Sequence, residues 1–224
     1  MDIEIISATR LTREEFWGKS ALGLSMRRLV QDKRLLTRVV PLNTRGLPLI
    51  YNEALSTGRT DRIVAMIHDD VWIEDYFLAE RLQEGLAQFD VIGVAGNRRR
   101  LARQPNWACV DSRLQLDEPR YLSGAVAHGP KPFGAVRYFG EAPAQCELLD
   151  GVLLAVKRSR VQETQCWFDP RFDFHFYDLD FCRTARSRGL RLGTWPICLT
   201  HQSGGAVGES WHRGYRSYLE KWGD

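Results

Sequence analysis

The feature that most constrains the fold is an alternation of strand-like and helix-like patterns through the first 95 residues. Apolar, strand-like runs occupy residues 3–7, 36–42, 62–67 and 91–95. Between them, apolar residues recur at the spacing of an amphipathic helix. Strands that alternate with helices pack as a largely parallel sheet, because each helix crosses back along one face. The sequence therefore predicts an α/β fold, with a Rossmann-like, mostly parallel sheet and helices on both faces.

Local signals place the first helical segment. Thr12 and Glu15 have the spacing of a capping box, in which the two residues satisfy each other's backbone N–H groups. Leu22, Leu29 and Val30 are among the apolar residues that continue the helical period. We expect helical structure to begin after Thr12 and to run through Val30.

The pattern changes in the second part of the chain. Residues 98–145 are rich in Gly, Pro and Arg and have no long apolar period, which is typical of loops and short strands. The elements expected from here on are short antiparallel strands at 107–110, 125–128 and 136–139, strands at 147–156 and 190–196, and helices at 178–188 and 210–222. The simplest organisation is a single domain over residues 1–224, with a nucleotide-binding first half and a more irregular second half.

Charge and cysteine content narrow the class of protein. The net charge of +3 over 224 residues is too small to indicate nucleic-acid binding, but it suits an anionic small substrate or weak contact with an acidic membrane surface. The five cysteines include no CxxC pair, which favours free thiols in a reducing cytosol. The N-terminus lacks a signal-peptide pattern, and no apolar run approaches the roughly 18 residues of a membrane span. We therefore expect a cytoplasmic protein, at most peripherally bound at the inner face of the membrane.

A buried strand ends in three polar residues. The run IVAMI at 63–67 is followed directly by His68, Asp69 and Asp70. Two adjacent carboxylates at the end of a buried strand are costly without a positive partner, and ligands of open α/β sheets bind at that end. A divalent cation bound together with a phosphate-bearing substrate satisfies both conditions. The alternative is a strand that ends in a solvated acidic turn.

A second acidic pair opens a helix in the segment FHFYDLDFC at 174–182. Asp178 and Asp180 lie near its start, where the helix dipole favours negative charge. They are either capping residues or include a general base that faces a pocket. The neighbouring aromatic residues form either an apolar wall, which raises the basicity of such a carboxylate, or ordinary core.

Two further segments contain residues suited to ligand binding. His201 lies in the segment LTHQSGGAVG at 199–208, whose glycines allow backbone N–H groups to approach phosphate, and a neutral imidazole is a good ligand for ions such as Mn²⁺. Asp150 and Gly151 precede an apolar run, and the glycine would let a substrate approach the backbone closely. The alternatives are a structural histidine and a plain turn before a buried strand.

Four motifs in a fixed order resemble a known enzyme family. They read GLPLIYNEAL, IVAMIHDDVWI, ELLDGVLLAVKRS and FDFHFYDLDFCRTARSRGL, the last followed by the loop HQSGG. Over residues 36–205 the chain resembles the inverting family-2 nucleotide-sugar glycosyltransferases, and especially their compact bacterial members. The resemblance implies a fold of the GT-A type, with a smaller antiparallel part in the second half. It also implies that 1–97 is the nucleotide-binding half and 98–224 the acceptor-binding and catalytic half.

The resemblance implies roles for individual residues. Residues 68–70 stand at the DXD-like position, so Asp70, or as second choice Asp69, is expected to bind a divalent cation, Mn²⁺ or Mg²⁺, and His201 to complete its ligands. Asp178 falls on the catalytic base, where Tyr177 precedes it in place of the family's usual Glu, and Asp180 is the alternative base. The donor-binding positions expected are Ser7, Asn43, Arg45, Asn52, Asp69, Asp150 and Gly151.

The function implied by the resemblance is metal-dependent, inverting transfer of a sugar from a nucleotide-sugar donor, a UDP-sugar first of all, to an acceptor hydroxyl. The acceptor would be a saccharide or a lipid-linked saccharide, and the pathway bacterial surface polysaccharide synthesis.

Other interpretations stay open. A nucleotidyltransferase would need a basic, glycine-rich loop after the first strand, whereas residues 8–18 contain one glycine. The others are a nucleotide-sugar-binding module without catalysis and an interaction protein that docks through the basic run at 98–103, which is otherwise a solvated loop.

Overall fold

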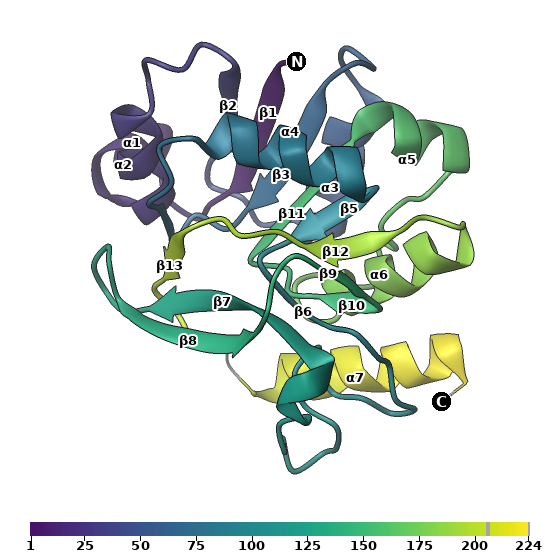
Figure 1. Ribbon diagram of the computed structural model, residues 1–224. Coiled ribbons are helices and arrows are strands. Elements are labelled where there is room, and N and C mark those ends of the chain that lie inside the picture. Colours follow the sequence, from purple (N-terminus) through teal and green to yellow (C-terminus); the bar gives the residue numbers. More distant parts are fainter. Residues whose placement is uncertain (205–206, 224) are drawn as a thin grey trace.

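The computed structural model describes residues 1–204 and 207–223, which form two adjoining β-sheets with helices packed around them (Figure 1). Within this part of the chain the larger sheet has seven strands in the order β2-β1-β3-β11-β5-β12-β9. They are β1 (Ile3–Ala8), β2 (Leu35–Val40), β3 (Ile63–Ile67), β5 (Val91–Gly93), β9 (Ala144–Cys146), β11 (Leu153–Lys157) and β12 (Leu192–Thr194). Strands β11 and β9 run antiparallel to their neighbours, and the other adjacent pairs are parallel. The predicted α/β fold with a parallel core is confirmed.

Helices cover both faces of this sheet. The helices are α1 (Arg13–Lys19), α2 (Ala21–Arg28), α3 (Leu47–Ser56), α4 (Leu78–Gln88), α5 (Arg158–Thr164), α6 (Tyr177–Ser187) and α7 (Glu209–Trp222), with a 3₁₀ turn η1 (Pro119–Tyr121). Glu4 of β1 contacts α5, whereas Ile5 aligns across the sheet with Ile92, which lies under α4. Because adjacent residues of a strand face opposite sides, α4 and α5 lie on opposite faces.

The first helical segment is divided into two helices. The capping box expected at Thr12 is present, with Glu15 as its second member. Ser20 then adopts extended backbone, ends α1, and begins α2 by accepting a hydrogen bond from Gly23 N. A Cβ at Gly23 would lie 2.0 Å from the Phe16 carbonyl oxygen, so glycine is needed for this tight helix–helix turn.

The second sheet is mostly antiparallel and lies beyond the ends of the larger one. Its described strands follow the order β10-β6-β7-β13-β4, and β8 pairs with β7. They are β4 (Val71–Ile73), β6 (Ala95–Asn97), β7 (Leu122–His128), β8 (Ala135–Gly140), β10 (Leu148–Leu149) and β13 (Leu199–His201). The chain passes between the two sheets at residues 68–70, 94 and 150–152. Polar residues of the predicted site therefore lie at the junction of the sheets.

Some predicted elements differ from the structure. The single strand expected at 147–156 is wrong, because a turn at Asp150 and Gly151 separates β10 from β11, and these strands belong to different sheets. The strand expected at 107–110 is reduced to an isolated bridge between Cys109 and Leu116. Helix α5 was not expected from the apolar pattern, because Val161 is its only fully buried apolar residue.

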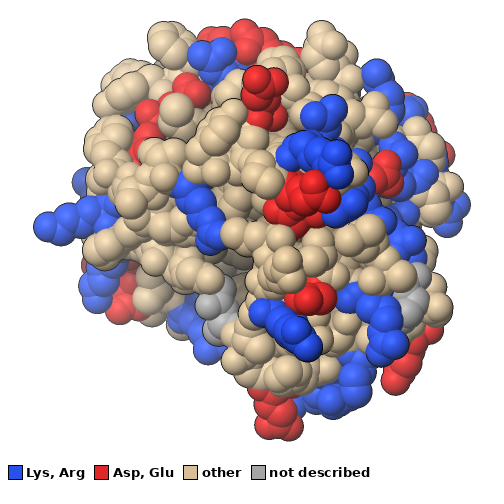
Figure 2. Space-filling view, turned by 60° about the horizontal axis from the view of Figure 1, so that its bottom comes forward, with Lys and Arg blue, Asp and Glu red and all other residues tan. Residues whose placement is uncertain are grey.

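The basic run at 98–103 does not form an isolated positive patch. Arg99 donates to both carboxylate oxygens of the buried Asp117, at 3.0 and 2.5 Å, and its guanidinium lies 3.6 Å from the centre of the Tyr121 ring. Figure 2 shows Lys and Arg interspersed with Asp and Glu over the face that it presents. Arg99 of this run is therefore part of the folded structure.

Two further observations concern the cysteines and the helices. All five cysteines are free thiols, four of them buried and Cys198 exposed. Among the described residues, no helix is both long enough and apolar enough to cross a membrane.

Candidate functional site

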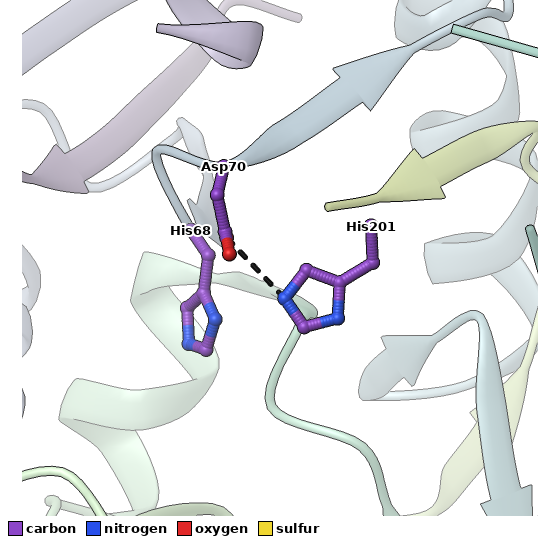
Figure 3. A group of neighbouring side chains, drawn as sticks. All are labelled: His68, Asp70 and His201. Carbon is purple, nitrogen blue, oxygen red and sulfur yellow. Dashed lines mark ion pairs between the residues drawn. The ribbon is translucent and has the colours of Figure 1, made fainter. Parts of the chain in front are cut away.

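A possible metal-binding group lies where the two sheets meet. His68 and Asp70 belong to the turn between β3 and β4, and His201 ends β13, where it pairs with Val71 of β4. Asp70 Oδ1 lies 3.3 Å from His201 Nε2, and one donor atom from each of the three residues lies within 4.8 Å of the others. Figure 3 shows the three side chains converging from these separate segments.

Backbone hydrogen bonds hold the turn at 68–70 in place. The N–H of His68 donates to Val152 O at 3.3 Å, and Asp70 O accepts from Gln202 N at 3.0 Å. The side chain of Asp69 points to the end of β1, where its Oδ2 accepts a 2.5 Å hydrogen bond from Thr9 Oγ1. The two adjacent carboxylates therefore diverge, and only Asp70 joins the two histidines.

The pKa shifts of Asp70 and His68 suit a cation site, whereas that of His201 favours its protonated form. The burial of Asp70 acts to raise its pKa, but the hydrogen bond and charge of His201 outweigh burial and lower it to about 2. Burial lowers the pKa of His68, which favours a neutral imidazole at pH 7. Burial also acts to lower the pKa of His201, but the hydrogen bond and charge of Asp70 raise it, so metal binding at the His201 nitrogen competes with protonation.

The donor set fits a first-row transition metal better than magnesium. Two imidazole nitrogens and one carboxylate oxygen are ligands of Mn²⁺, Fe²⁺ or Zn²⁺, whereas Mg²⁺ prefers oxygen ligands. Three protein ligands also leave coordination positions open for a substrate.

Asp178 lies in the first turn of α6, next in sequence to Tyr177, whose hydroxyl contacts His68 of this group. Its Oδ2 accepts a 3.0 Å hydrogen bond from Gly151 N, and its Oδ1 accepts from Leu179 N at 2.9 Å. Burial, followed by the charge of Asp150, raises the pKa of Asp178 to about 7. A Cβ at Gly151 would lie 2.3 Å from the Tyr177 hydroxyl, so only glycine fits this contact between the 150–152 turn and α6.

Asp180 is placed differently, although it lies only two residues further along α6. Its side chain is 0% exposed, and its Oδ1 lies 2.7 Å from Lys221 Nζ and accepts from Trp222 Nε1 at 2.9 Å. The residue therefore attaches α7 to α6, and it has no exposed surface with which to contact an acceptor.

Among the other predicted donor-binding residues, Asn43 and Asn52 use their side chains in backbone hydrogen bonds, and Ser7 is buried. Asn43 forms a local turn by hydrogen bonding to both the N–H and the carbonyl of Arg45, in an exposed loop. Both amide atoms of Asn52 bind the backbone of Phe168, at 2.8 and 2.9 Å, so this side chain holds a loop. Ser7 is fully buried at the end of β1, and its Oγ has no hydrogen-bond partner among the described residues.

Sequence reasoning did not single out His68 or His128, and it left Phe174 and Tyr177 as either an apolar wall beside the acidic pair or ordinary core. His68 was seen only as part of the HDD motif, and the Tyr177 hydroxyl lies 2.9 Å from its Nε2. Phe174 stacks on the His68 ring, with 5.6 Å between ring centres, and is 55% exposed. The His128 ring lies 6.0 Å from that of His201. In the loop at 199–208, residues 205 and 206 lie outside the described residues.

Comparison with known proteins identifies the fold. No model of a known protein family matches the sequence, and no curated protein matches it. The structure of GalNAc-T7 with UDP, GalNAc and Mn²⁺ is similar over 100% of this chain and 48% of that chain, with a TM-score of 0.55 and 11% identity. The S. aureus TarS 1–349 structure is similar over 100% and 74% of the two chains, with a TM-score of 0.47 and 12% identity.

For mannosyltransferase PcManGT from Pyrobaculum calidifontis in complex with GDP-Man and Mn²⁺, the coverage is 96% and 59%, the TM-score 0.46 and the identity 14%. This chain spans about half the length of GalNAc-T7. The likeness to GalNAc-T7 shows that the α/β fold is of the GT-A type.

Proposed function

We propose that the protein transfers a sugar from a nucleotide-sugar donor to an acceptor hydroxyl, with a divalent cation held by His68, Asp70 and His201. The main support is a possible metal-binding group that hydrogen bonds, through Tyr177 and Gly151, to the turn that holds the Asp178 carboxyl, within a GT-A type fold. Gly151 connects the metal-binding group with Asp178. Its N–H donates to Asp178, and its carbonyl accepts from the hydroxyl of Tyr177, which also contacts His68.

A cation at this site would stabilise the leaving group of the reaction. When bound, a divalent cation neutralises charge on a departing diphosphate. Asp69 is held by Thr9 at the end of β1, on the side where ligands of open α/β sheets bind, and so would line the donor side. Asp150 would meet the sugar, since its charge acts on both Asp178 and His201.

Asp178 is the proposed general base. It accepts the proton of the acceptor hydroxyl as that oxygen forms a bond to the anomeric carbon, while the bond from that carbon to the diphosphate oxygen breaks. A base with a pKa near the working pH is efficient and contributes typically about 10²–10⁴-fold to the rate. A single displacement from the opposite face inverts the configuration at the anomeric carbon, so we infer an inverting enzyme.

The test is an assay of the purified protein with UDP- and GDP-sugars, Mn²⁺ and a panel of saccharide acceptors. We expect nucleoside diphosphate release, and a product whose anomeric configuration, read by NMR, is opposite to that of the donor. Asp178→Asn should lose at least 10²-fold in turnover and keep donor binding, whereas Asp70→Ala should lose Mn²⁺-dependent donor binding. Asp61→Asn, an exposed carboxylate paired with Arg59, is the matched control.

Two outcomes would replace the proposal. Calorimetric binding of a nucleotide-sugar without turnover on any acceptor, and without donor hydrolysis, would identify a binding module. Formation of a nucleotide-sugar from a nucleoside triphosphate and a sugar phosphate would identify a nucleotidyltransferase.

A further inference from the structure

The Tyr177 hydroxyl connects the metal-binding group to the helix that bears Asp178. Tyr177 begins α6 and is 3% exposed. Its oxygen lies 2.9 Å from His68 Nε2 and 2.9 Å from the carbonyl oxygen of Gly151. Both neighbours come from segments far from α6 in the sequence.

These two contacts determine where the protons lie. A phenol has one proton to donate, and a carbonyl oxygen can only accept. The Tyr177 hydroxyl therefore donates to Gly151 O, and its oxygen accepts a hydrogen bond from His68 Nε2–H. The Tyr51 side chain also interacts with the Tyr177 hydroxyl and must be the donor in that contact, because the single Tyr177 proton is already used.

This assignment leaves one nitrogen of His68 for a metal. A neutral imidazole carries a single proton, so a proton on Nε2 leaves the lone pair on Nδ1. In Figure 3 one ring nitrogen of His68 is on the side of Asp70 and His201, and the other is turned away from them. The hydrogen bond to Tyr177 therefore accounts for the nitrogen that points away.

We propose that Tyr177 is a positioning residue that fixes His68 in the Nε2–H tautomer and presents Nδ1 as the metal ligand. The inference rests on the proposed function, because it assumes the cation site. Tyrosine stands at the position where the resemblance leads one to expect Glu, and an ionised carboxylate could not donate to Gly151 O. The same hydroxyl thus bridges the metal ligand and the glycine whose N–H holds Asp178.

The ring and the hydroxyl of Tyr177 can be tested separately. The ring also packs on Phe168, with centres 6.0 Å apart, so Tyr177→Phe keeps the core and removes only the hydrogen bonds. Tyr218→Phe is a matched control, because Tyr218 is also buried and its hydroxyl contacts Arg183 at 3.3 Å instead of His68.

The first measurement is the tautomer of His68 in metal-free protein, read by ¹⁵N–¹H correlation of labelled histidine at pH 7.5 and assigned with a His68→Gln variant. We expect the Nε2–H form in the wild type and in Tyr218→Phe, and loss of this single form in Tyr177→Phe. An Nδ1–H tautomer in the wild type would overturn the inference. The wild-type spectrum decides this point even if Tyr177→Phe does not fold.

The second measurement is Mn²⁺ affinity by calorimetry, without any substrate. Loss of a partner that orients a metal ligand typically weakens metal binding about 10–100-fold, and we expect this in Tyr177→Phe but not in Tyr218→Phe. Equal affinity in Tyr177→Phe and the wild type would overturn the positioning role. A wild type that shows the Nε2–H tautomer but binds no Mn²⁺ would overturn the proposed function and the ligand role of Nδ1, and would leave the hydrogen bond to Tyr177 standing.

Discussion

Replacement of the proposed catalytic base should stabilise the protein, and more so as the pH rises. In the folded state the pKa of Asp178 is raised from 3.8 to about 7, by burial and then by Asp150. The folded state therefore holds a proton that the unfolded state has released between about pH 4 and 7. Because stability falls with pH wherever the folded state binds more protons, Asp178 costs stability progressively across this window. Asp178→Asn removes the cost.

The size of the effect follows from the pKa values. Each pKa unit corresponds to about 1.36 kcal/mol, so the full rise is worth about 4 kcal/mol, and the part between pH 5 and pH 8 about 2–3 kcal/mol. The side chain is only partly buried and its carboxylate keeps two backbone hydrogen bonds, so these values are upper limits. The Asn side chain does not titrate, so the cost of placing its NH₂ group beside a backbone N–H donor is the same at every pH.

The assay is urea unfolding of the wild type and of Asp178→Asn in EDTA, at pH 5 and at pH 8. The free energy of unfolding of the variant, relative to the wild type, should increase by 1–3 kcal/mol between the two pH values, within the limit set by linkage. Other titrating groups largely cancel in this double difference, and Asp61→Asn, which is exposed, should show no such increase. A difference that stays constant or decreases with pH would refute the assignment of Asp178 as a carboxyl with a raised pKa.

Three further predictions follow from the same geometry. Gly151→Ala should lower the midpoint of thermal unfolding and abolish turnover, because the new Cβ would lie 2.3 Å from the Tyr177 hydroxyl; an active variant of normal stability would contradict this contact. Asp180→Ala should cost about 1–3 kcal/mol in urea unfolding, because Trp222 Nε1 loses its acceptor while Lys221 keeps its ion pair with Asp169, and a loss below about 0.5 kcal/mol would show that these contacts are unimportant. Asp150→Asn should move the rising limb of the kcat/KM–pH profile to lower pH, because the charge of Asp150 raises the pKa of the base; an unchanged limb would remove this coupling.

The sequence predicts the sheet and the position of the site for physical reasons that are local. The run IVAMI forms β3, in which every residue is buried, and the polar residues after it mark the end of the strand where ligands bind. The same local logic fails at 147–156, where the apolar residues on both sides of Asp150 and Gly151 together predict one strand. Apolar residues are needed in both sheets, so hydrophobicity alone does not show that the chain changes sheets at Asp150 and Gly151.

The proposed metal ligands and the proposed base depend on contacts that no local sequence pattern contains. The hydrogen bond between His68 and Tyr177 joins residues 109 positions apart, and the sequence offers only the types of side chain, without their pairing. The choice between Asp178 and Asp180 is instructive, because residues two apart on a helix do not share a face, so at most one of them can line a site. Helix geometry thus argues against a joint role, but it does not say which of the two residues faces the site. That depends on α7, because its Lys221 and Trp222 bind Asp180, whereas Asp178 binds the N–H of Gly151.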